Sequence, residues 1–154
     1  MTHTAAAPAS ERRMVLDTNV LLSLWVFVDS RYLPIRAAME GGAWAALTDA
    51  ACLAEFERVL GYPEFKLDAH AQRKILGEYS ALAHPIKLTA CVPLPHCSDH
   101  DDQKFLELAC RGAAQFILTS DKALLKLARH RTFKQQLGIG ILSPQSFMES
   151  CLQY

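Results

Sequence analysis

Two hydrophobic patterns alternate along the chain and predict its secondary structure. Short apolar runs closed by turn residues predict buried strands, whereas apolar residues at helical spacing predict helices. Strands are expected over residues 14–16, 43–47, 86–92, 115–118 and 139–142. Helices, with their capping residues where these are clear, are expected over residues 20–28, 33–39, 48–60, 68–82, 98–112, 119–129 and 144–152. Strands that alternate with helices predict an α/β fold with a mainly parallel sheet.

Two of the predicted strands end in a polar sequence that contains an aspartate. Asp17 directly follows the first strand, and Asp121 ends the run Thr119-Ser120-Asp121 after the strand at 115–118. Because the carboxyl ends of parallel strands meet at one edge of a sheet, where open α/β folds bind ligands, we expect both carboxylates there. Each also has a structural explanation, since Asp17 can be a turn residue and Asp121 can cap its helix.

Further acids lie on two of the predicted helices. If Ser98 and Asp101 form a capping box, Asp102 is free to face the edge of the sheet, although the order of the elements alone does not place the start of this helix at that edge. In the helix that runs to residue 60, Glu55 and Glu57 flank the apolar face on opposite sides. Helical spacing alone does not choose between these two glutamates.

The composition limits the class of protein. The chain has 154 residues, no formal net charge, 51% hydrophobic and 21% charged residues, which is typical of a globular domain and gives no overall support to nucleic-acid binding. Its five cysteines form no CxxC pair, so we expect reduced thiols and a cytoplasmic location rather than a disulfide framework or a zinc site. Residues 1–13 are expected to be a flexible tail, and the longest apolar run, 20–28, is too short to span a membrane.

The acidic segments resemble the motifs of the PIN-domain family. Val-Leu-Asp-Thr-Asn-Val-Leu is similar to the first motif, and its acid is Asp17. The segment 53–65 is similar to the part of the family in which a glutamate precedes an apolar residue, which favours Glu55 over Glu57. The resemblance implies a three-layer fold over residues 14–154, with the sheet between layers of helices.

The resemblance extends through the second half of the chain. Residues 99–109 are similar to the third motif, with Asp102 as its acid and Asp99 as an auxiliary one. Phe-Ile-Leu-Thr-Ser-Asp-Lys-Ala-Leu-Leu is similar to the fourth motif, and its acid is Asp121. Residues 141–147 resemble the closing strand and helix of the family.

Four carboxylates suit a hard divalent cation better than they suit a phosphate. Carboxylates repel a phosphodiester, but they can hold Mg²⁺ or Mn²⁺, which prefer oxygen ligands and stabilise negative charge. The expected ligands and catalytic residues are Asp17, Glu55, Asp102 and Asp121, with Asp99 as an additional ligand. Hydrogen bonds that orient them are expected from Thr18, Asn19, Thr119 and Ser120. A basic series on the helix after Asp121 can follow an RNA backbone or be a solvated face: Lys122, Lys126 and Arg129.

The resemblance implies a metal-dependent endoribonuclease, the toxin of a toxin–antitoxin system, with RNA as substrate and a cognate antitoxin protein as partner. A homodimer is a further expectation, and a membrane partner is not expected. One alternative is an aspartate-dependent phosphatase, although the position at which such enzymes carry a second acid is Asn19 here. The other alternative is a non-catalytic PIN-like module that binds RNA or protein.

Overall fold

The computed structural model of the chain describes residues 12–87, 94 and 102–152. Five parallel strands form one sheet in this part of the chain: β1 (Arg13–Leu16), β2 (Ala45–Thr48), β3 (His84–Pro85), β4 (Phe116–Leu118) and β5 (Gly140–Leu142). Their order is β3-β2-β1-β4-β5, so the chain moves outward from β1 in one direction and later in the other. The strand order therefore reverses between β1 and β4, and a crevice is expected at such a switch point.

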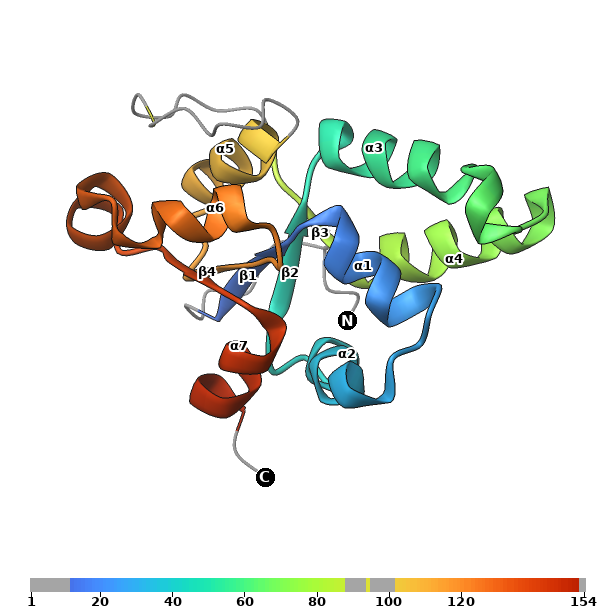
Figure 1. Ribbon diagram of the computed structural model, residues 1–154, viewed down its shortest axis with the longest axis horizontal. Coiled ribbons are helices and arrows are strands. Elements are labelled where there is room, and N and C mark those ends of the chain that lie inside the picture. The colour runs from blue at the N-terminus through green and yellow to red at the C-terminus, as the bar shows by residue number, and fades with distance from the viewer. Residues whose placement is uncertain (1–11, 88–93, 95–101, 153–154) are drawn as a thin grey trace, which may run out of the picture.

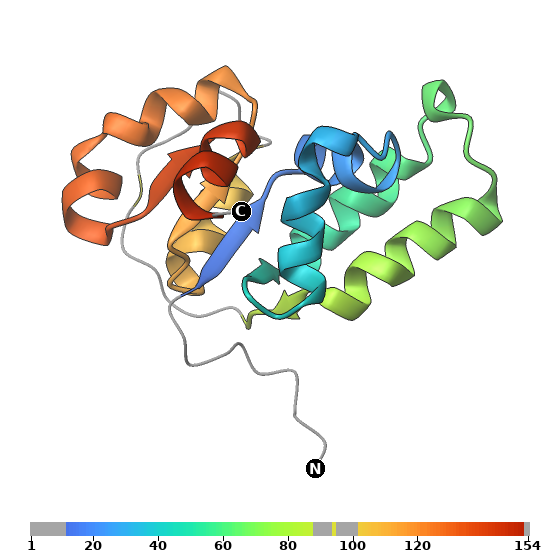
Figure 2. The same ribbon diagram turned by 90° about the horizontal axis from the view of Figure 1, so that it is seen from below.

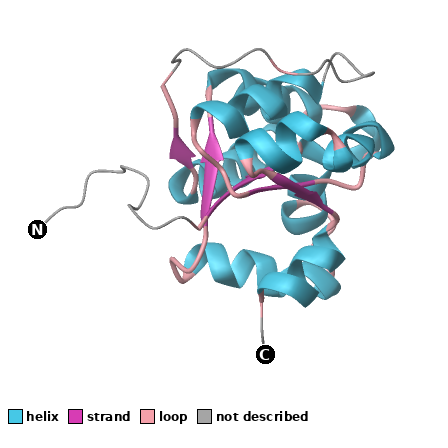
Figure 3. Cartoon of the chain, turned by 90° about the vertical axis from the view of Figure 1, so that its left-hand side faces the viewer, coloured by secondary structure: helices cyan, strands magenta, loops and turns pink. Residues whose placement is uncertain are grey.

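Helices cover both faces of the sheet (Figures 1 and 3). They are α1 (Thr18–Trp25), α2 (Leu33–Glu40), α3 (Ala50–Leu60), α4 (Ala69–Leu82), α5 (Gln103–Arg111), α6 (Lys122–Lys126) and α7 (Pro144–Cys151). Short 3-10 turns occur at Ser30–Tyr32, Pro63–Phe65 and Leu127–Arg129, and a π-helical segment spans Thr132–Leu137. The prediction of a parallel sheet between helical layers is confirmed.

Alternation along β1 divides the core into two parts. Met14 and Leu16 pack with side chains of α1, α2, α3 and α7, whereas Val15 packs on the opposite face with α5 and α6. Figure 2, seen from below, shows β1 between α1, α2, α3 and α4 on one side and α5 and α6 on the other. Burial on both faces explains why β1 is a continuous apolar run rather than an alternating one. Because β1 is central and fully covered, the residue at its carboxyl end is held rigidly.

Two predicted elements differ from the structure in their bounds. The helix expected over 20–28 starts earlier and ends at Trp25, where the amides of Val26 and Phe27 both donate to the Leu22 carbonyl; Val28, beyond this end, adopts a left-handed conformation with φ 47°. The strand expected over 86–92 is misplaced: β3 spans only His84–Pro85, and Ile86 and Lys87, the described residues of the expected range, lie after it. Pro85 is tolerated there because β3 is an edge strand. Residues 88–92 lie outside the described residues.

The cysteines depart from the sequence-based expectation. Cys52 and Cys151 are free thiols, as predicted, but Cys110 is disulfide-bonded. The prediction that all five thiols are reduced is therefore wrong. No helix in the described part of the chain is both long and apolar enough to cross a membrane.

Candidate active site

Asp17 and Thr119 lie side by side where the strand order reverses. The parallel register pairs Leu16 with Leu118, the last residues of β1 and β4, so Asp17 and Thr119 are the residues that directly follow the paired strands. The Asp17 amide continues this pairing by donating to the Leu118 carbonyl at 3.1 Å. The Thr119 hydroxyl donates to Asp17 Oδ2, and Asp17 Oδ1 accepts from the Val20 amide at 2.9 Å. Asp17 thus caps α1 while it is tied to β4.

The Asp17 carboxyl is shielded from solvent and surrounded by other acids. Asp17 as a whole residue is only 2% exposed to solvent. Burial raises the pKa of this carboxyl to about 6, against the hydrogen bonds from Thr119 and Val20, which lower it. The negative charges of Asp121 and Glu55 raise the pKa further. Because Asp17 responds to both charges, all three carboxylates belong to one electrostatic environment.

Asp121 is connected to Asp17 through Thr119. Its amide donates to Thr119 Oγ1 at 2.9 Å, and its own Oδ1 accepts from the Ala123 amide at 2.7 Å at the start of α6. The expected capping role of Asp121 is therefore confirmed, and its charge still reaches Asp17. A cap and a contributor to an acidic site are compatible roles for the same residue.

Glu55 is held by basic and hydroxyl groups. Its Oε1 lies 2.7 Å from Lys104 Nζ on α5 and 3.9 Å from the guanidinium of Arg58, one helical turn further along α3. Its Oε2 accepts from the Thr18 hydroxyl. The side chain of Glu55 is 11% exposed, whereas Glu57 lies on the exposed side of α3. Glu55 is thus the glutamate of α3 that faces the aspartates.

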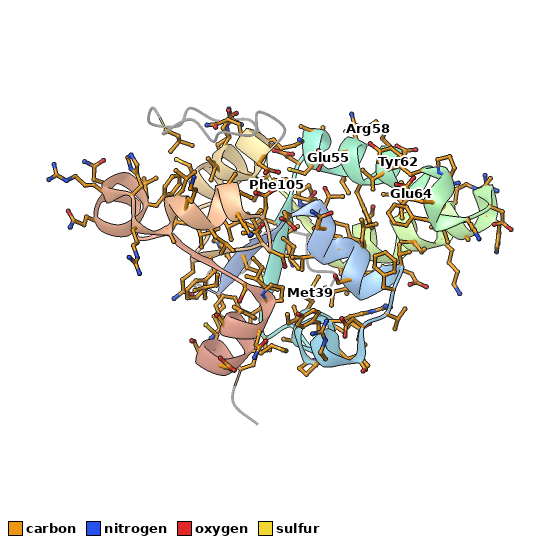
Figure 4. The ribbon with its side chains drawn as sticks, in the orientation of Figure 1. Met39, Glu55, Arg58, Tyr62, Glu64 and Phe105 are labelled. Carbon is orange, nitrogen blue, oxygen red and sulfur yellow. The ribbon has the colours of Figure 1, made fainter. Side chains whose placement is uncertain are left out.

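A cleft with a volume of about 310 Å³ lies beside these acidic side chains. Three of the predicted acids line it, namely Asp17, Glu55 and Asp102, together with Asn19 of α1. Asp102 is the residue before α5, and its side chain does not cap that helix. Figure 4 shows Glu55 on α3 and Phe105 on α5, two residues that line this cleft from different helices. The structure therefore brings three of the four predicted acids into one cleft and places the fourth, Asp121, beside it.

A family model describes this same part of the chain. The model of the PIN domain matches residues 13–123, which is more than half of the chain and contains all four acids. The chain belongs to the PIN-domain family. PIN domains are generally nucleases and typically bind divalent metal ions. A comparison with curated proteins gave no match.

The acids of this PIN domain fit a divalent cation by their chemistry and charge. Oxygen ligands suit Mg²⁺ or Mn²⁺, and a cation would relieve the repulsion that Asp17 experiences from Asp121 and Glu55. Within the described residues, however, no three acidic, histidine or cysteine side chains are grouped closely enough to hold a metal as they stand. In this structure Glu55 instead forms an ion pair with Lys104. The expected convergence of all four carboxylates is thus only partly reached in this conformation.

The remaining predicted site residues have different surroundings. Thr18 and Thr119 donate to acids of the site, as described above. Asn19 and Ser120 are exposed, and within the described part of the chain neither side chain donates to a carboxylate. Asp99, the additional ligand, lies outside the described residues. The three basic residues of the predicted RNA-binding series are exposed on α6 and the turn after it: Lys122, Lys126 and Arg129.

Sequence reasoning missed several residues of the cleft. Lys104 and Arg58 place positive charge beside Glu55, and Tyr62 and Phe65 line the cleft beyond α3. Arg58 could have been found, since it lies three residues after Glu55 on the same helix. Lys104 could not, because its contact joins α3 to α5, which are far apart in sequence.

Proposed function

We propose that this PIN-domain protein is a divalent-metal-dependent endoribonuclease and that it acts as the toxin of a toxin–antitoxin pair. The observation that carries the proposal is the environment of Asp17. It is a buried carboxylate with a raised pKa, at the switch point of a parallel sheet, and it shares a cleft with Glu55 and Asp102. Perturbed acids in a cleft at such a position are typical of a catalytic site.

Each acidic residue of the site would have its own role in the hydrolysis of RNA. When bound, Mg²⁺ or Mn²⁺ supplies positive charge that offsets the scissile phosphate and lowers the pKa of the attacking water. Asp17 has a fixed orientation, since the Val20 amide and the Thr119 hydroxyl hold its two oxygens. Asp17, Asp102 and Asp121 would hold the cation, directly or through water. Glu55 would share in holding it or orient the attacking water, and Arg58 at the cleft would attract the RNA phosphates.

Activity assays on matched variants test this proposal. We expect a labelled RNA to be cut by the wild type with Mg²⁺ or Mn²⁺, and not with EDTA. The variants Asp17→Asn, Glu55→Gln and Asp102→Asn should lose about a hundredfold or more of the rate, as expected when groups that stabilise a transition state are removed. Glu57→Gln removes the same charge from the exposed side of α3 and should keep full activity. Full activity in folded Asp17→Asn would contradict the proposal.

The toxin role has its own test. Expression of the wild type in bacterial cells should arrest growth, and expression of Asp17→Asn should not. Co-expression of the neighbouring reading frame, the expected source of the antitoxin, should restore growth. Growth arrest by both variants would show that the effect does not depend on cleavage, and would oppose the role proposed for the site.

One observation favours a second candidate, a non-catalytic module that binds RNA or protein. No group of three potential ligands is assembled among the described residues, and Lys104 neutralises Glu55. Isothermal calorimetry with Mn²⁺ distinguishes the two, since the non-catalytic module should show no binding that depends on Asp17. The phosphatase is not favoured, because Asp17 is 2% exposed and both of its oxygens accept hydrogen bonds, which leaves it poorly placed as a nucleophile.

A further inference from the structure

Aromatic side chains continue the cleft on the side away from α5. Tyr62 and Phe65 follow the end of α3 and line the cleft itself. Their rings are close to parallel, at an angle of 4°, with centroids 6.4 Å apart. Phe27, from the loop after α1, meets Phe65 edge to face with centroids 5.8 Å apart. We call Phe27, Tyr62 and Phe65 the aromatic patch.

The aromatic patch is open to solvent, which is unusual for rings of this size. Phe27 is 62% exposed and Tyr62 is 39% exposed. Phe65 is partly buried against the core and anchors the other two rings. Exposing an apolar ring to water without a partner is unfavourable, so contiguous exposed rings beside a cleft indicate a ligand.

The backbone of the loop after α1 keeps Phe27 at the surface. The helix ends when the amides of Val26 and Phe27 both donate to the Leu22 carbonyl, each at 2.9 Å. Val28 then takes a left-handed conformation with φ 47°, which is strained for a β-branched residue. The Asp29 amide closes the turn on the Ser23 carbonyl at 2.9 Å. The loop therefore holds Phe27 outward instead of allowing it to fold into the core.

We propose that the aromatic patch stacks unpaired bases of a single-stranded RNA whose backbone enters the cleft. Flat rings with open faces bind nucleobases without regard to sequence. The patch is continuous with the acids, because Tyr62 and Phe65 line the same cleft as Asp17 and Glu55. Arg58, one turn before Tyr62, offers a positive charge to a phosphate at this point (Figure 4). Glu64, which also lines the cleft there, repels phosphates, so bases rather than backbone are expected over the rings.

This inference rests on the proposed function, since it adds to that site a surface that stacks the bases of the same RNA. A duplex keeps its bases stacked on one another and cannot offer them to the patch. A protein partner would also bury the rings, but it would use them as apolar surface. The two kinds of ligand therefore differ in whether a leucine of similar size can replace the ring.

Binding measurements on Asp17→Asn, which is expected not to cleave, test the patch. The probes are fluorescein-labelled oligo-A and oligo-C as single strands, and a labelled RNA duplex, measured by fluorescence anisotropy with Mn²⁺ present. Adding Phe27→Leu or Tyr62→Leu should weaken single-strand binding by about tenfold, a typical effect of losing one stacked base. Adding Tyr62→Phe keeps the ring and should leave the affinity unchanged. Both positions are exposed, so the fold should persist, and thermal unfolding checks this.

Each outcome decides for or against the patch. Loss of single-strand binding in the leucine variants, with duplex binding unaffected, supports it. Equal affinity in the parent and the leucine variants overturns it, as does a parent that binds no single strand. Leucine variants that bind normally while Phe27→Ala and Tyr62→Ala fail also overturn it, because that result indicates an apolar contact. The proposed function fails separately, if the wild type cleaves no RNA in the presence of Mn²⁺ or Mg²⁺.

Discussion

The raised pKa of Asp17 predicts that this carboxylate destabilises the metal-free fold at neutral pH. Replacing it by asparagine removes the buried charge while keeping a side-chain oxygen that can accept from the Val20 amide. Asparagine and aspartate are equally good at the N-cap position, so α1 should keep its start. We therefore expect Asp17→Asn to be more stable than the wild type at pH 7 in the presence of EDTA.

The size of the effect follows from the shift in pKa. The Asp17 carboxyl rises from its ordinary value of 3.8 to about 6 on folding. A difference of roughly two units corresponds to about 3 kcal/mol of unfolding free energy at a pH above both values. The aspartate also gains about 0.3–1 kcal/mol from the dipole of α1, which asparagine loses. The net gain expected for Asp17→Asn at pH 7 is therefore about 2 kcal/mol.

The pH dependence gives the prediction its sign. Below pH 3.8 the carboxyl is protonated in both the folded and the unfolded chain, so it imposes no penalty on folding. As the pH rises toward about 6, the unfolded chain ionises first and the wild type loses stability. The stability difference between the two proteins should thus be near zero at pH 4 and grow until about pH 6 to 7.

Urea denaturation of both proteins in EDTA, from pH 4 to pH 7, measures this difference. Glu57→Gln is the matched control, since it removes one carboxylate from an exposed position and should shift the curve by less than about 0.5 kcal/mol. Adding Mn²⁺ should stabilise the wild type and leave Asp17→Asn nearly unchanged, because only a ligand that prefers the folded state raises stability. A metal-free Asp17→Asn that is equal to the wild type at pH 7, or weaker, would refute the reasoning.

Three further predictions address the rest of the molecule. A Cβ at Gly112 would overlap Leu47 in the core, so Gly112→Ala should lower the free energy of unfolding by about 1–3 kcal/mol. A Cβ at Gly77 on α4 meets no other atom, so Gly77→Ala should raise the free energy of unfolding by about 0.5–1 kcal/mol. Urea denaturation of the two variants and the wild type measures both changes. Lys104→Met frees the Glu55 carboxylate, so we expect the Mn²⁺ concentration for half-saturation, measured by calorimetry, to fall by roughly fivefold. EDTA should lower the melting temperature of wild-type protein prepared with Mn²⁺, and added Mn²⁺ should restore it.

The fold and part of the site could be predicted because they depend on local rules. Apolar runs that end in Asp17 and Thr119 predicted two parallel strands, and the parallel register alone brings their ends together. The end of α1 could not be predicted in this way. Phe27 and Val28 continue an apolar run, but hydrophobicity does not show whether a residue is buried or held at the surface for a ligand.

The contacts of Glu55 show where sequence patterns stop being informative. Helical spacing placed Glu55 and Glu57 equally well, and the family resemblance was needed to choose between them. The structure separates the two by exposure and pairs Glu55 with Lys104, a contact between α3 and α5. Such a pair depends on how α3 and α5 pack against each other. Helical spacing within one helix carries no information about its packing with a helix that is far away in the sequence.

Asp17 combines requirements that oppose one another. Its oxygens cap α1 and accept from Thr119, which stabilises the fold, while burial beside Asp121 and Glu55 makes its charge unfavourable. If Asp17 were needed only as a cap, asparagine would be equally effective and would bring no buried charge. An aspartate at this position is explained if its negative charge has a partner during function. A cation bound between Asp17 and the neighbouring acids would be that partner, and it would convert the electrostatic penalty into binding energy.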